Sequence, residues 1–133
     1  MQQEIFGKGW TKLTDKGKFR IDTLLPMRDG YTISRNADMG KEGAVTYFSM
    51  GAHTSISQES YDSPSIYLGC RGKGTFWLGE KRRRAELSAG EMLIVPGGML
   101  CGSETQNGLI YTEIITKKES NMNEAVKAGE VLN

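Results

Sequence analysis

Turn-forming residues recur along most of the chain, and this spacing constrains the fold more than any other feature. Glycine accounts for 17 of the 133 residues, about twice its usual frequency of roughly 7%. Apolar residues show no helical period before residue 119. Short apolar runs separated by frequent turns are typical of an all-β sandwich or barrel, and we predict a fold of that class.

Short apolar segments, and segments in which polar and apolar side chains alternate, predict the individual strands. They cover residues 19–25, 31–35, 44–50, 54–58, 65–68, 75–78, 84–87, 92–95 and 109–115. The glycine-rich segment 69–74 predicts a tight connection, and residues 121–129 a short helix or linker. We therefore expect N-terminal strands and loops over residues 1–43, a barrel core over 44–116, and a C-terminal helix or linker over 117–133.

The charge balance argues against several classes of partner. The 17 basic and 16 acidic residues leave a net charge of +1, which gives no general attraction to nucleic acid or to an acidic membrane. The basic run Lys81–Arg84 is expected to be a solvated hairpin tip, because no aromatic platform accompanies it. Neither a signal-peptide pattern nor a long apolar run is present. We expect a cytoplasmic protein with reduced thiols at Cys70 and Cys101.

The segment from Gly90 to Cys101 is the most specific motif in the chain. Gly90, Pro96 and Gly98 are spaced as in the second motif of the cupin superfamily, and Cys101 stands where that motif has a histidine. Residues 66–76 resemble the end of the first cupin motif, with Gly72 at its closing glycine. The chain therefore resembles a divergent cupin over about residues 44–116. This resemblance implies a double-stranded β-helix, the RmlC-like jelly-roll barrel.

The chain departs from the cupin pattern at the metal-binding positions. The family usually holds a first-row metal with three histidines and one glutamate. Counting back from Gly72 puts the glutamate position at Ser65. Depending on the gap, the two histidine positions fall on Gln58 and Ser60 or on Glu59 and Tyr61. The first pair is slightly preferred.

The only histidine, His53, lies upstream of both pairs, and we expect it on the surface or at a strand edge. Too few imidazole and carboxylate donors remain for a first-row metal. We therefore predict that the domain uses neither a metal nor another cofactor.

Without a metal, the barrel mouth is expected to present small polar and aromatic side chains. Such a lining suits an uncharged or weakly polar small molecule. The candidate ligand-binding residues are Gln58, Ser60, Tyr61, Ser65, Tyr67, Trp77, Cys101, Ser103 and Tyr111. The leading hypothesis is a metal-independent cupin-like domain that binds an unidentified small molecule.

Other hypotheses stay open. A metal-free isomerase or epimerase of a carbohydrate-like substrate could use His53 as a base beside a tyrosine acid, and Cys101 could act as a nucleophile. A structural or dimerisation module without a ligand is the third class. We expect a homodimer, because unpaired edge strands favour association. A second cupin domain is the alternative partner, since the apolar pair Val131–Leu132 favours the first half of a two-cupin protein.

Overall fold

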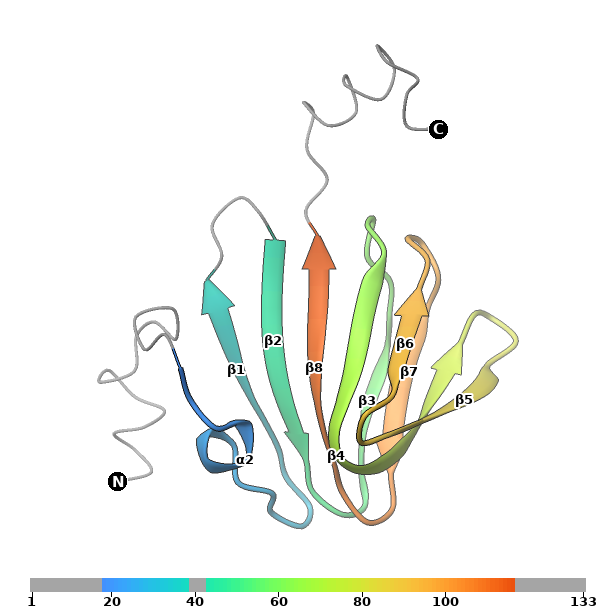
Figure 1. The fold of residues 1–133 in the computed structure, drawn as a ribbon. Helices are drawn as coiled ribbons and strands as arrows, with labels where there is room; N and C mark the ends of the chain where they lie inside the picture. The colour runs from blue at the N-terminus through green and yellow to red at the C-terminus, as the bar shows by residue number, and fades with distance from the viewer. Residues whose placement is uncertain (1–17, 39–42, 117–133) are drawn as a thin grey trace.

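The structure, a computed structural model, describes residues 18–38 and 43–116. These residues form an eight-stranded sheet that curls on itself, with one helical turn, α2 (Ile21–Leu24), against its N-terminal side (Figure 1). Among them, no helix is long and apolar enough to cross a membrane. The predicted helix or linker at 121–129 lies outside the described residues. The all-β prediction is confirmed.

The eight strands pair antiparallel in an order that differs from their order along the chain. They are β1 (Thr32–Asp38), β2 (Gly43–Met50), β3 (Thr54–Glu59), β4 (Ser65–Leu78), β5 (Arg83–Ser88), β6 (Met92–Val95), β7 (Cys101–Thr105) and β8 (Leu109–Thr116). The sheet runs β1-β2-β8-β4-β7-β3, and β5 and β6 also pair with β4. The last strand thus lies between β2 and β4, a non-sequential arrangement typical of jelly-roll folds.

The long strand β4 connects the two halves of the curled sheet. Up to Gly72 it pairs with β6 and β8, and from Lys73 it pairs with β5 and β7. The register with β8 shifts between Gly69 and Arg71, and Gly72 has a φ of +79°. A Cβ atom on Gly72 would collide with the carbonyl oxygen of Gly108. The turn from one half to the other therefore requires glycine at this point.

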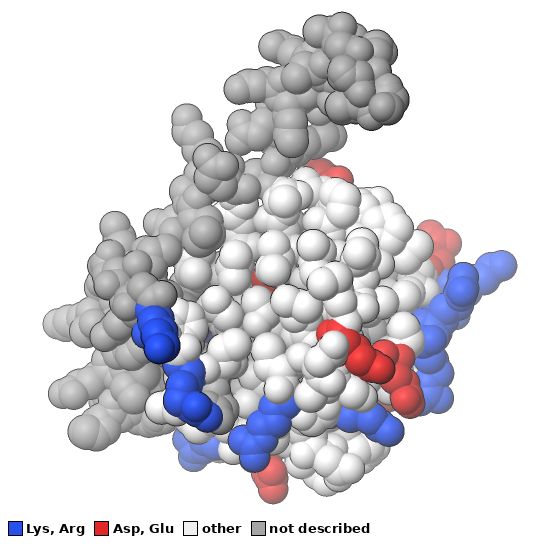
Figure 2. Space-filling model, viewed as in Figure 1, with Lys and Arg blue, Asp and Glu red and all other residues white. Residues whose placement is uncertain are grey.

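Side-chain alternation divides the sheet into an inner and an outer face. On β8, Leu109 and Tyr111 belong to the interior hydrophobic cluster, together with Phe76 and Met50 from β4 and β2. The outer face of β1 and β2 packs against the helical turn through a second cluster that contains Leu25. Charged side chains lie mainly along the rim of the face shown in Figure 2, with basic and acidic groups interspersed on its right-hand side.

Three sequence-based predictions are corrected by the structure. Residues 19–25 contain the helical turn α2 and no strand, because adjacent Leu24 and Leu25 are buried in the same cluster, which strand geometry does not allow. The predicted strands 65–68 and 75–78 are one strand, β4, and its glycines provide a bend in place of a tight turn. The polar strand β7 was not expected; pairing with β3 on one side and β4 on the other stabilises it.

Candidate functional site

A pocket of about 130 Å³ lies inside the curled sheet, between the inner faces of its two halves. Aromatic, hydroxyl, thiol and carboxyl side chains from five strands and from the loop after β3 converge on it. Its lining consists of Phe48, Ile56, Ser57, Glu59, Tyr61, Tyr67, Phe76, Cys101, Gly102, Ser103, Tyr111 and Glu113. A mostly apolar cavity with a few convergent polar groups is the usual form of a small-molecule site.

Mutually packed aromatic rings form much of the pocket wall. Phe48 stacks on Tyr111 with ring centroids 5.0 Å apart, and Tyr67 lies 5.0 Å from Phe76. Edge-on contacts of 5.8 Å and 5.3 Å join Tyr111 to Tyr67 and to Phe76. Offset and edge-on geometries of this kind are the favourable ones for aromatic pairs. Each ring is therefore held by its neighbours, and the wall is preorganised.

The carboxyl group of Glu113 is the least expected feature of the interior. Glu113 lies directly opposite Tyr67 in the β4–β8 register, and only 7% of its surface is exposed. Burial raises the pKa of this carboxyl group above its ordinary value, and the nearby charge of Glu59 raises the pKa further. Hydrogen bonding from Tyr67 and Tyr61 acts in the opposite direction. No Lys, Arg or His appears among the described residues that line the pocket.

Tyr61 and Glu59 form the rim of the pocket. The Tyr61 hydroxyl donates a hydrogen bond of 3.2 Å to Glu59 Oε1. The backbone N–H of Gly98 donates a 2.7 Å hydrogen bond to the carbonyl oxygen of Tyr61. The turn that carries the second cupin-like motif therefore positions the rim tyrosine.

The remaining polar groups of the pocket are neutral near pH 7. Burial raises the pKa of the Cys101 thiol to about 11, and it also raises the pKa values of the Tyr67 and Tyr111 hydroxyls above their ordinary range. Ser65 Oγ lies 3.4 Å from the Tyr67 hydroxyl, to which it donates. These groups act as hydrogen-bond donors and acceptors, and a thiolate nucleophile at Cys101 is not favoured.

The structure brings together most of the sequence-predicted ligand-binding residues. The pocket lining includes Tyr61, Tyr67, Cys101, Ser103 and Tyr111. Ser65 is buried directly beside the lining, at the Tyr67 hydroxyl. That any of them contacts a ligand stays a prediction.

Besides Ser65, three of the predicted residues lie outside this lining. The Gln58 side chain donates to the carbonyl oxygens of Trp77 and Gly79, at 3.3 and 3.2 Å. Ser60 is exposed after β3. Trp77 points away from its buried neighbour Phe76, as alternation requires, and the Arg82 and Arg84 guanidinium groups lie 5.1 and 5.2 Å from its ring centroid.

The structure also distinguishes the two possible pairs of family histidine positions. Glu59 and Tyr61 line the pocket, whereas Gln58 and Ser60 do not. The cause is a register irregularity between Ile56 and Glu59, where β3 pairs with β7. An irregularity of this kind moves every later side chain to the opposite face, so Glu59 and Tyr61, the second of the two pairs, face the pocket.

The positions that hold the metal in the cupin pattern do not fit a first-row metal in this chain. They are occupied by Glu59, Tyr61, Ser65 and Cys101, with no imidazole among them. His53 is exposed in the turn before β3, with a φ of +63°. Within residues 18–38 and 43–116, no three His, Cys, Asp or Glu side chains are grouped so that they could hold a metal ion.

Sequence reasoning missed Glu113 and the two phenylalanines of the wall, Phe48 and Phe76. Glu113 could have been found from alternation, because it follows Tyr111 by two residues and therefore shares its face. Tyr67 was predicted from its place on a strand of the cupin-like motif, and Tyr111 as a possible aromatic wall. A glutamate in an otherwise apolar strand was the available signal.

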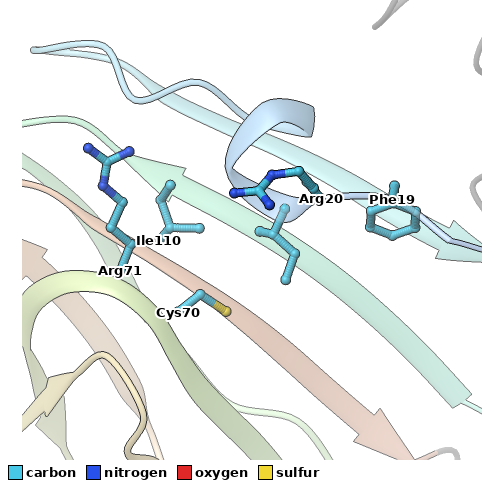
Figure 3. Close-up of a pocket in the computed structure, with 6 residues that line it drawn as sticks. Phe19, Arg20, Cys70, Arg71 and Ile110 are labelled. Atoms are coloured by element: carbon cyan, nitrogen blue, oxygen red, sulfur yellow. The ribbon is translucent and has the colours of Figure 1, made fainter.

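A second, shallower depression of about 380 Å³ lies on the outer face, between the segment that leads into α2 and the β4–β8 pair. Figure 3 shows Arg20 and Arg71 approaching it from opposite sides, with Cys70 and Ile110 between them. The Cys70 sulfur lies 3.5 Å from the Thr112 hydroxyl and from the Leu68 carbonyl oxygen, to which it donates. Fewer groups converge here than in the interior pocket, which is therefore the candidate site.

No family model and no curated protein matches the sequence, but solved structures match the fold. A cupin superfamily protein from Desulfitobacterium hafniense is 17% identical over 75% of this chain and 90% of its own, with a TM-score of 0.69. A double-stranded β-helix protein from Klebsiella pneumoniae is 15% identical over 74% of this chain and 88% of its own, with a TM-score of 0.66.

A third similar structure, a cupin 2 conserved barrel domain protein from Leptotrichia buccalis, is 17% identical, with a TM-score of 0.69. The match covers 74% of this chain and 47% of that protein. The chain thus has a double-stranded β-helix fold. Within that fold class it has the fold of the cupin superfamily in a divergent form, as the Gly90–Cys101 motif predicts.

Proposed function

We propose that this cupin-like barrel binds a small molecule in its interior pocket, without a metal. The observation that carries the proposal is the buried Glu113 carboxyl group, which faces a preformed cavity together with three tyrosines and a cysteine. A buried ionisable group without a basic partner reduces stability. Its position in a cavity supports a binding role, because perturbed carboxyl groups concentrate at functional sites.

The size of the pocket limits the ligand. Pockets for drug-sized molecules usually enclose about 300–1,000 Å³, whereas this one encloses about 130 Å³. The ligand is therefore a molecule of few heavy atoms, or one end of a longer molecule. A regulatory or sensory role for such binding accords with the divergence from the family's metal site.

An enzymatic alternative, isomerisation or epimerisation, is supported by the position of Glu113 in the pocket, although the predicted base does not reach it. His53 is exposed and outside the lining, so it does not supply the expected base. Glu113 could replace it, because burial raises the pKa of its carboxyl group toward the range useful for proton transfer. Tyr67, directly opposite, would then be the acid.

Native mass spectrometry with elemental analysis of freshly purified protein tests the binding proposal. We expect an organic molecule to co-purify, and no stoichiometric Fe, Mn, Ni or Zn. Cys101→Phe, which fills the pocket, should abolish the adduct. Cys70→Phe, the same replacement on the outer face, should retain it, with melting curves confirming that both variants fold. Stoichiometric metal, or an adduct that persists in Cys101→Phe, would contradict the proposal.

A further inference from the structure

The interior pocket combines aromatic walls with acidic groups, and this combination favours a positively charged ligand. Five of its lining side chains are aromatic: Phe48, Tyr61, Tyr67, Phe76 and Tyr111. Two others, Glu59 at the rim and Glu113 in the interior, are acids. No basic side chain appears among the described residues of the lining, so any charge that the lining side chains carry is negative.

Aromatic faces also carry negative potential. A cation over such a face, within about 6 Å of the ring centroid, is attracted to it, most strongly when water is excluded. A carboxylate in the same cavity adds a direct charge interaction that is stronger in a low-dielectric interior than in water. An ionised Glu113 would repel an anionic ligand, and among small ligands only a cation would supply its carboxylate with a counter-charge.

We propose that the ligand of this pocket is a small organic ammonium ion, held by the aromatic walls and by the Glu113 carboxylate. The inference rests on the proposed binding function and specifies its ligand class. It replaces the expectation of an uncharged ligand, which was made without Glu113. A cavity of about 130 Å³ suits a single ammonium group with a few carbon substituents. A bare inorganic cation fits less well, because such ions prefer a shell of several oxygen ligands.

The test compares two probes of nearly equal shape, tetramethylammonium and tert-butanol, by titration into ¹⁵N-labelled full-length protein at constant ionic strength. We expect tetramethylammonium to shift backbone resonances of β4 and β8 at the pocket, and to bind at least about tenfold more tightly than tert-butanol. Pivalate, the anionic probe of similar shape, should not bind.

Two variants separate charge from packing. Glu113→Gln keeps the side-chain shape and should weaken tetramethylammonium binding by about tenfold or more. Glu86→Gln removes the same charge from an exposed site on β5 and should leave binding unchanged. Lowering the pH should weaken binding to the wild type more than it weakens the residual binding to Glu113→Gln.

Equal binding of both probes, with no effect of Glu113→Gln, would overturn the ammonium assignment and leave small-molecule binding intact. Failure of every probe to shift the inward-facing residues would also overturn the assignment. The co-purification experiment tests the proposed function independently of either result.

Discussion

At the residue scale, the buried carboxyl group of Glu113 bears both on the stability of the fold and on the proposed ligand binding. Its side chain lies where an apolar residue would suit the fold better, between the ring of Tyr67 and the rim at Glu59. Sequence reasoning found the tyrosines of this site from the cupin-like motif strands and from the aromatic residues expected to form walls. It missed Glu113 because a single acid in a strand is ordinarily a solvent-facing residue, although its two-residue spacing from Tyr111 places both on one face.

The pKa of Glu113 has a direct consequence for stability. Because burial raises the pKa in the folded state, the folded protein favours the protonated form more than the unfolded chain does. The free energy of unfolding therefore decreases as the pH rises from the ordinary glutamate pKa through the raised pKa of Glu113 in the folded state. Glu113→Gln, which mimics the neutral form, should unfold at a higher urea concentration than the wild type at pH 7.

The same comparison at pH 4 is the internal control. There the wild-type carboxyl group is mostly protonated, so the difference between Glu113→Gln and wild type should shrink. Glu86→Gln, an exposed site, should differ little from wild type at either pH, within about 0.5 kcal/mol. A Glu113→Gln variant that is less stable than wild type by the same amount at both pH values would contradict the assigned cause.

At the element scale, a strand could be predicted where its own sequence pattern indicates a strand. It could not be predicted where only pairing with distant strands stabilises it. β2 and β8 are rich in β-branched and aromatic side chains, and they lie where predicted. β7 has no such pattern, since Cys101–Thr105 is mostly small and polar, and it is a strand because both its edges are paired. Pairing of that kind depends on residues distant in sequence, which no local pattern contains.

The glycines of β4 can also be interpreted in two ways from the sequence. Glycine in a strand indicates either a turn or a bend with close backbone approach, and the sequence favoured the turn. The structure shows the bend at Gly72, where both a positive φ and the carbonyl oxygen of Gly108 exclude a side chain. The position of this bend determines which side chains of β4 enter the pocket.

Substitution of Gly72 should therefore be more damaging than substitution of a glycine that needs only its φ. Gly90 has a φ of +86° and open space around its Cβ position, so Gly90→Ala should cost about 1–2 kcal/mol of unfolding free energy. Gly72→Ala adds a backbone displacement and should cost about 3 kcal/mol or more. Urea unfolding of both variants measures the difference. Equal losses would show that β8 can move aside at Gly108 without cost.

At the scale of the whole molecule, the outer face of the sheet carries a row of apolar side chains. Ile94 on β6 is paired with Ile66 on β4, which is paired in turn with Ile114 on β8. Ile94 is 61% exposed, and Met92 on the same strand is 56% exposed. Contiguous exposed apolar residues usually indicate an interaction surface. The homodimer predicted from the edge strands would have a suitable contact here.

We expect the wild-type protein to have twice the chain mass of 14.7 kDa in light scattering after size-exclusion chromatography. Ile94→Lys places a charge within this contact and should weaken association by about tenfold or more, because burying an unpaired charge is costly. Tyr31→Lys changes an equally exposed aromatic residue, 60% accessible, before β1, and should leave the dimer intact. A wild-type monomer at every concentration would contradict the dimer. A dimer weakened by Tyr31→Lys and not by Ile94→Lys would place the contact on the β1 side of the sheet.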